Sequence, residues 1–229
     1  MLLFVAAIIT LSCLPVSVLS DPAPRDALLY RVDIYVPPEE GRNETADIQQ
    51  VKETVKSLTD IKVLFSFKEL GNPRIILVLD VEKACSWPQL TGFLSSKGYE
   101  FSVTSLYGCS DFAKEIGISL PKDIWSSSLG NVDLVMDRKI YRVGDLTTLE
   151  YNEMLQWMFE RDVVIRKTVQ RKKACFKSLA DFPVEVMYFG QASQYVMDVM
   201  EGYLHGPRYF QNELTRIEQL DDYTGSCHK

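Results

Sequence analysis

Residues 29–36 read LYRVDIYV, and residues 140–147 read IYRVGDLT. In the first stretch Val32, Ile34 and Val36 alternate with other side chains, and a period of two is typical of a β-strand. The shared Tyr-Arg-Val predicts that the second stretch is also a strand. It suggests the hypothesis that this second strand opens a second copy of one structural unit.

The chain from the first stretch onward predicts the order β-α-β-β-α-β. Alternating or continuous apolar runs indicate strands, and apolar residues three or four apart indicate helices. The expected strands are residues 28–36, 61–70, 74–81 and 99–107, and the expected helices are residues 45–58 and 87–97. This order is the ferredoxin-like arrangement.

The same order is expected again after residue 138. Thr147 and Glu150 have the spacing of a capping box, which predicts that a long helix begins there. The expected strands of this half are residues 139–146, 176–180, 184–190 and 208–217, and its second helix covers residues 195–203.

Matching landmarks in the two halves support a tandem duplication. The landmark pairs and their separations are Tyr30 and Tyr141 (111 residues), Pro73 and Pro183 (110 residues), and Tyr99 and Tyr209 (110 residues). A period of this length indicates two domain-sized copies rather than a solenoid. We therefore expect a first unit at 21–109, a connector at 110–138 and a second unit at 139–229.

The repeated unit resembles the dimeric α+β barrel superfamily, and in particular its muconolactone-isomerase-like branch. The likeness is carried by LYRVDIYVPPE (29–39) with the helix after it, and by IILVLDVEKACSWPQLTGFL (75–94). The resemblance implies four-stranded sheets that pair face to face across two subunits, a contact that two copies in one chain would make internally. The expected fold class is therefore α+β, with two tandem ferredoxin-like β-α-β-β-α-β units paired sheet to sheet as a single-chain dimeric α+β barrel. No family site is carried over, because no catalytic motif matches residue by residue.

The first twenty residues are typical of a secretory signal peptide. They carry no charge, the run Leu2–Leu11 is apolar, and Val18 and Ser20 occupy the −3 and −1 positions before Asp21. The alternative is an uncleaved membrane anchor, because the segment is nearly long enough to span a bilayer. We expect cleavage, which gives a secreted, extracellular protein without a membrane anchor.

Composition argues against two classes of partner. The net charge of −6 argues against a general nucleic-acid-binding surface. His205 and His228 are the two histidines, and no pair of cysteines has CxxC spacing, so a zinc site, a haem ligand or another metal centre is not expected. The sequence therefore predicts no cofactor.

Four cysteines remain once Cys13 leaves with the signal peptide. Cys85, Cys109, Cys175 and Cys227 are an even number, which predicts two disulfides in a secreted chain. Three pairings are open, and pairing within each unit would join Cys85 to Cys109 and Cys175 to Cys227.

One glycosylation sequon is present. Asn43-Glu44-Thr45 lies in a polar stretch, so we expect a glycan on Asn43.

Polar side chains on two expected strands are the first candidates for a site. Asp33 and Tyr35 share a strand face with Arg31, and Glu185 shares one with Met187. Under the functional interpretation, Asp33 or Glu185 is a carboxylate that transfers a proton, with a pKa raised by burial. The interpretation that the sequence favours is that these groups face solvent or helix edges.

Two other polar features have competing interpretations. His205 suits acid–base chemistry near neutral pH, but a histidine beside Gly206-Pro207 is more often a turn residue or a helix cap. The run RKTVQRKK (166–173) has five basic residues in eight, which suits a sulfated polysaccharide or a proteolytic site. The favoured interpretation is a solvated helix end.

The sequence thus favours a secreted, cofactor-free and non-enzymatic protein that binds a small apolar ligand or forms part of an extracellular matrix. The argument is the lack of a catalytic signature such as GxSxG, HExxH or a P-loop. The alternative, suggested by the family resemblance, is a cofactor-independent isomerase, cyclase or monooxygenase that acts on a small aromatic or polyketide-like compound.

Overall fold

The structure is a computed structural model that describes residues 28–121, 124–130, 133–141, 144, 146–169, 172–181, 183–192 and 210–226. Side chains are described in these ranges except at 161–169, 210 and 226. The expected signal peptide at 1–20, the helix at 195–203, His205 and Cys227 lie outside the described residues.

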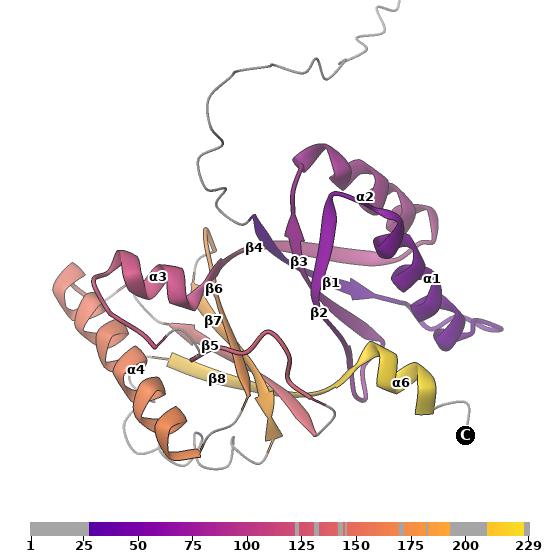
Figure 1. The fold of residues 1–229 in the computed structure, drawn as a ribbon. Helices are drawn as coiled ribbons and strands as arrows, with labels where there is room; N and C mark the ends of the chain where they lie inside the picture. The colour runs from indigo at the N-terminus through magenta and orange to yellow at the C-terminus, as the bar shows by residue number, and fades with distance from the viewer. Residues whose placement is uncertain are drawn as a thin grey trace, which may run out of the picture.

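Eight antiparallel strands close into a barrel in the order β1-β3-β2-β8-β5-β7-β6-β4 (Figure 1). The strands are β1 (Leu29–Tyr35), β2 (Ile61–Glu69), β3 (Arg74–Val81), β4 (Glu100–Gly108), β5 (Leu134–Tyr141), β6 (Lys173–Ser178), β7 (Val184–Gln191) and β8 (Phe210–Gln219). The helices are α1 (Glu44–Ser57), the short 3-10 helix η1 (Ala84–Ser86), α2 (Trp87–Ser96), α3 (Cys109–Glu115), α4 (Thr148–Val169) and α6 (Leu220–Ser226). The expected α+β class is confirmed, and the sheet is a closed barrel.

The helices cover two opposite sides of the barrel. Figure 1 shows α1 and α2 on one side and α3 and α4 on the other, while α6 follows β8 and lies beside α1 and β2. No helix within the described ranges is long and apolar enough to cross a membrane.

Strand alternation divides the apolar residues between the barrel interior and the helix-covered faces. On β1, Val32 and Ile34 face α1 and α2, whereas Leu29 faces the interior. The interior core also includes Phe67, Ile76, Val78, Met136, Phe176, Met187 and Phe189. The core under α3 and α4 includes Tyr141, Leu155, Phe159, Val186 and Tyr188. A strand with apolar residues on both faces, such as β3, is therefore buried on both sides.

The caps of α1 and α4 explain where these helices begin. The Oδ1 of Asn43 accepts a hydrogen bond from the Ala46 N–H at 3.2 Å, so Asn43 caps α1, and the helix begins at Glu44, one residue before the expected start at 45. The capping box of α4 is confirmed, because Glu150 Oε2 accepts from the Thr147 N–H at 2.8 Å and the Glu150 N–H donates to Thr147 Oγ1.

The shared Tyr-Arg-Val was a misleading landmark. Tyr30 lies near the start of β1, but Tyr141 is the last residue of β5, where it pairs with Val184 as Tyr35 pairs with Arg74. The expected strand 139–146 is therefore wrong in its bounds. The segment 134–138 belongs to β5 because Leu134 and Met136 contribute to the interior core.

A β-bulge divides β2 between two faces. The alternation of Ile61, Phe65 and Phe67 predicts one common face, but the register shifts between Val63 and Phe65. Two residues of β2 then oppose one residue of β3. As a result, Ile61 packs under α1, whereas Phe65 and Phe67 point into the barrel.

One disulfide joins the two halves of the chain. Cys109 and Cys175 are bonded, across 66 residues of sequence, and Cys85 is a free and exposed thiol. Of the three open pairings, the one within each unit, Cys85 with Cys109 and Cys175 with Cys227, is therefore wrong. The reason is strand order, since Gly108 of β4 pairs with Phe176 of β6 and brings the following Cys109 beside Cys175.

The disulfide leads to a stability prediction. Replacing Cys109 and Cys175 together with alanine will lower the free energy of unfolding by about 4 kcal/mol, because an unbridged chain of this length gains conformational entropy when it unfolds. Urea unfolding of non-reduced protein measures this change. Cys85→Ser is the matched control and will leave the free energy unchanged; an equal loss in the control would contradict the pairing.

The cap of α1 leads to a second prediction. In protein made without glycosylation, Asn43→Ala will lower the free energy of unfolding by about 1 kcal/mol, because the Ala46 N–H loses its acceptor. Thr45→Ala is the control, since it also removes the sequon but keeps the cap. Equal urea midpoints for the two variants would show that Asn43 does not stabilise α1.

Candidate functional site

A buried ion-pair cluster occupies one end of the barrel interior. The guanidinium of Arg31 on β1 donates to Asp33 at 2.7 Å and lies 3.6 Å from Glu185 on β7. Strands β1 and β7 are not neighbours, so Arg31 reaches Glu185 across the interior. The side chains of Asp33 and Glu185 are 12% and 9% exposed, so the interpretation that they face solvent is wrong.

Glu185 is held as a carboxylate. Arg138 forms a two-pronged contact to it, with Nε–Oε2 at 2.9 Å and Nη2–Oε1 at 2.5 Å, and also donates to Glu213. Burial alone would raise the pKa of Glu185, but the hydrogen bonds and charge of Arg138, with the charge of Arg31, hold this pKa below its usual value of 4.5. The expectation that burial raises the pKa of Glu185 is therefore wrong, and this carboxyl is not a proton donor near neutral pH.

The remaining predicted residues do not join this cluster. Tyr35 follows Asp33 on the same face of β1, but it is 36% exposed. His205 lies outside the described residues, as do the side chains at 166–171 of the basic run. Lys173, at the end of that run, is a buried residue of β6 whose ammonium lies 3.9 Å from the ring centroid of Tyr188, and not a solvated helix end.

An aromatic layer closes the barrel beyond the ion pairs. Phe67 and Phe189 stack with centroids 5.1 Å apart, and Phe65 and Phe176 pack against them. Met187 contacts the Arg31 guanidinium and so joins the polar end to this layer. The ion-pair cluster is therefore sealed on its inner side, which suits a structural role.

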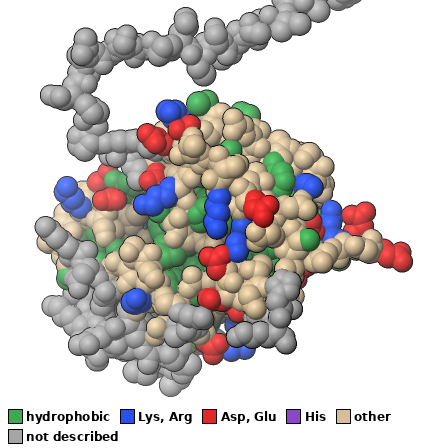
Figure 2. Space-filling model, turned by 45° about the vertical axis from the view of Figure 1, so that its right-hand side comes forward, with side chains coloured by type: hydrophobic (Ala, Val, Ile, Leu, Met, Phe, Trp, Pro, Cys, Tyr) green, Lys and Arg blue, Asp and Glu red, His purple; other side chains and the backbone are tan. Residues whose placement is uncertain are grey.

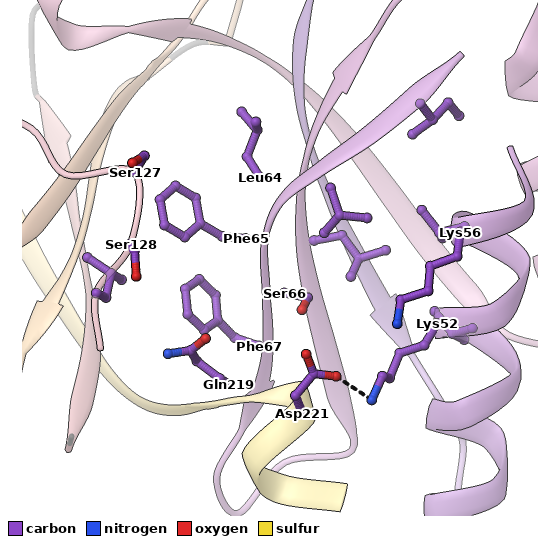
Figure 3. Close-up of a pocket in the computed structure, with 16 residues that line it drawn as sticks. Lys52, Lys56, Leu64, Phe65, Ser66, Phe67, Ser127, Ser128, Gln219 and Asp221 are labelled. Atoms are coloured by element: carbon purple, nitrogen blue, oxygen red, sulfur yellow. Dashed lines mark ion pairs between the residues drawn. The ribbon is translucent and has the colours of Figure 1, made fainter. Parts of the chain in front are cut away.

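A cavity of about 390 Å³ lies on the other side of the aromatic layer, between β2, α1, α6 and the loop 124–130 (Figure 3). It exists because β2 pairs with β8 only over Phe67–Glu69, which leaves the earlier part of this edge of β2 without β8. On one side of β2 the cavity is lined by Phe65, Phe67 and Leu129, and on the other by Val51, Val55, Ile61 and Leu77. Its size suits a small organic molecule.

The polar groups that line the cavity come from α1, β2, α6, β8 and the loop 124–130. Figure 3 shows Lys52 and Lys56 reaching from α1 toward Ser66 of β2 and Asp221 of α6. The Lys52 ammonium lies 2.5 Å from Asp221 Oδ1 and holds the pKa of this carboxyl below its usual value. Further lining groups on the barrel side are Ser127, Ser128 and Gln219. The view in Figure 2 shows a hollow with apolar side chains inside and charged side chains along its edge.

The described residues show no arrangement of ligands for a metal ion. No group of three or more His, Cys, Asp or Glu side chains there is arranged to hold a metal ion. Neither histidine is described, so the expected lack of a cofactor stays a prediction.

Sequence reasoning missed the residues of this cavity. Lys52 and Lys56 are four apart beside Val51 and Val55, a spacing that places polar groups next to an apolar stripe. The sequence could therefore have pointed to Lys52 and Lys56. It could not have placed Asp221 beside them, because α6 reaches α1 only after β8 has crossed to the first half of the chain.

No protein-family model matches the chain, and no curated protein sequence does. Solved structures do share its fold. A chlorite dismutase variant from Candidatus Nitrospira defluvii is similar, with 12% identity, a TM-score of 0.57 and 88% of this chain and 96% of that chain covered. A candidate monooxygenase from Fusobacterium nucleatum subsp. nucleatum is similar, with 7% identity, a TM-score of 0.52, and 85% and 93% covered. At these identities the likeness shows the fold alone: a chlorite-dismutase-like, dimeric α+β barrel.

These comparisons overturn the favoured functional prediction. The expectation of a non-enzymatic ligand-binding or matrix protein is wrong, because the structures named as similar are a chlorite dismutase and a candidate monooxygenase.

The ion-pair cluster leads to a prediction about pH. Glu185→Gln will lower the free energy of unfolding at pH 7 by about 2 kcal/mol, since Arg138 and Arg31 lose a buried anionic partner but each keeps another carboxylate. A carboxyl whose pKa is lowered on folding stabilises the protein above its usual pKa, so the gap between variant and wild type will shrink as the pH falls below 4.5. Urea unfolding at pH 7, 5, 4 and 3 measures both effects.

The control for this prediction is Glu213→Gln. Glu213 also binds Arg138, but its side chain is 43% exposed, so its loss will cost less than about 1 kcal/mol. A gap for Glu185→Gln that does not change between pH 7 and pH 3 would show that the carboxylate charge contributes nothing.

Proposed function

We propose that this chain is an enzyme that acts without a metal or organic cofactor on a small, largely apolar compound bound in the cavity beside β2. The reaction classes are isomerisation, cyclisation or mono-oxygenation of an aromatic or polyketide-like compound. The observation that carries the proposal is the cavity itself, which joins apolar walls from both sides of β2 to a few polar groups, as substrate sites usually do.

The three reaction classes share a first step, which is removal of a proton from the substrate. Asp221 lies at the edge of the cavity as a carboxylate: its side chain is 76% exposed, and the hydrogen bond and charge of Lys52 lower its pKa. In the proposed step the carboxylate accepts a proton from an acidic C–H or O–H, and the substrate keeps the electron pair as an enolate or phenolate. Lys52 and Lys56 then stabilise this anion by their charge.

The finer architecture is part of the proposal. We infer a tandem duplication, supported by the symmetry of strand pairing: β1 pairs with β3 and β4 as β5 pairs with β7 and β8, and β2–β8 mirrors β4–β6. The likeness to the muconolactone-isomerase-like branch stays a prediction.

Secretion and glycosylation at Asn43 are further parts of the proposal. The Cys109–Cys175 disulfide supports an oxidising compartment, and Asn43 is exposed at the start of α1.

Conversion of model compounds tests the activity. We expect the purified full chain to convert at least one member of a panel of phenols, enols and β-diketones in air, with products analysed by mass spectrometry. An unchanged mass identifies isomerisation, and loss of water identifies a dehydrative cyclisation. Replacement of two hydrogens by one oxygen identifies mono-oxygenation, in which O₂ is the oxidant, the substrate supplies the two electrons and the second oxygen atom leaves as water. Asp221→Asn will lower the rate by about 100-fold or more, because the proposed base is lost.

A matched pair of tryptophan variants ties the activity to the cavity. Ser128→Trp will fill the mouth of the cavity and lower the rate at least about tenfold by excluding substrate, whereas Ser95→Trp on the exposed surface of α2 will leave the rate unchanged. Equal rates for wild type, Ser128→Trp and Asp221→Asn would overturn the proposed site, and lack of conversion of any panel compound would overturn the proposed activity.

A further inference from the structure

We propose that the preferred substrate is a linear, polyketide-like carboxylic acid, with one terminal carboxylate and an enol or β-diketone group on its chain. Its carboxylate would lie at Lys56, and its chain would pass Phe65 into a second cavity. This inference rests on the proposed function, because it assigns a substrate class to the same site.

The charges of the first cavity favour a monoanion. Lys52 and Lys56 bring two positive charges, and Asp221 brings one negative charge that pairs with Lys52. No carboxylate of the described residues forms an ion pair with Lys56, whose charge acts on Asp221 only at longer range. The site therefore has a net charge of about +1 at neutral pH, which a single carboxylate neutralises.

The position of Lys56 fits a head group. Its side chain is exposed and projects from α1 over the opening between α1 and β2, as Figure 3 shows. A carboxylate placed there stays partly hydrated and avoids most of the cost of burying a charge. The apolar chain would then lie against Ile61, Leu77 and the aromatic layer, where it is removed from water.

A second cavity continues the first one. It has a volume of about 440 Å³ and lies at the end of the barrel beside the disulfide, lined in part by Trp125, Ala174 and Phe176. Both cavities are lined by Val63, Leu64, Phe65 and Ser127, so they meet at the bulge of β2. Two cavities placed end to end suit the extended, polyketide-like members of the proposed substrate class better than compact aromatic ones.

Phe65 carries the largest side chain of the four residues that line both cavities. Its ring lies 6.0 Å from the rings of Phe67 and Phe176 and 6.3 Å from that of Phe189, measured between centroids. It is half-buried, in contrast to the fully buried Phe67 and Phe189. We therefore assign Phe65 the role of setting the chain length that the site accepts.

Binding measurements test the head group without turnover. Isothermal titration of the full chain with dodecanoate, dodecanol and dodecyltrimethylammonium, each below its micelle concentration, compares three head groups on one chain. We expect dodecanoate to bind about fivefold more tightly than dodecanol, the ammonium compound to bind weakest, and the preference for the acid to fall with added salt.

Two pairs of variants assign these effects to residues. Lys56→Gln will remove the preference for dodecanoate over dodecanol, while Lys97→Gln, which removes an exposed lysine from the end of α2, will keep it. Phe65→Ala will join the cavities and shift the optimum from octanoate or dodecanoate toward hexadecanoate by about fivefold in relative affinity, because more apolar surface is buried. Leu149→Ala, at an exposed apolar position on α4, is the control for Phe65→Ala.

The outcomes separate this inference from the proposed function. Equal binding of dodecanoate and dodecanol, or a Lys56→Gln variant that keeps the preference, overturns the inference even if the panel compounds are converted. An unchanged chain-length optimum in Phe65→Ala overturns the role of Phe65. Selective binding of the acid without conversion of any compound supports the inference and overturns the proposed enzymatic activity.

Discussion

Closure of the barrel is the constraint on which the rest of this structure depends. The barrel is closed by two short strand pairings between its halves, β2 with β8 and β4 with β6, which we call seams. Each seam consists of three residue pairs. Because closure encloses the inner faces of all eight strands, those faces must be filled by side chains that satisfy one another. Apolar residues and stacked rings fill most of the interior. The remaining end is filled by four charged side chains, Arg31, Asp33, Arg138 and Glu185.

The cavity follows from the same constraint. The β2–β8 seam stops at Phe67, because β8 ends at Gln219 and continues as α6. The bulge at Leu64 then turns Phe65 inward, while Ser66 faces α1 on the other side of the strand. The stretch of β2 that does not pair with β8 thus borders a space that both the interior core and the core under α1 and α2 help to line. The polar groups that face this space are those that the short seam leaves accessible.

Much of the fold could be predicted from the sequence, because short-range patterns of residues determine it. Strands β1, β3 and β7 have continuous or alternating apolar runs, and the Thr147–Glu150 box marks the start of α4. The face shared by Arg31 and Asp33 was also identified, because alternation along a strand needs no tertiary knowledge. The sequence did not predict whether this face of β1 points to water or into a barrel, because that depends on which strands pair with β1.

The failures came from long-range pairing. The disulfide depends on β4 lying beside β6, the face of Phe65 depends on a bulge against β3, and the place of Asp221 depends on β8 crossing between halves. None of these three features produces a periodic pattern in the sequence. The Tyr-Arg-Val match shows the opposite case, in which a local identity suggested an equivalence that the strand register does not support.

The two seams differ in one respect that affects how the molecule responds to force or heat. The Cys109–Cys175 bond lies directly beyond the paired end of the β4–β6 seam, so that seam is covalently fastened. The β2–β8 seam is held by its hydrogen bonds and by the packing of α6, including the Lys52–Asp221 ion pair. If β2 and β8 separate, the barrel therefore stays joined at the disulfide, and the seam that opens is the one that borders the first cavity.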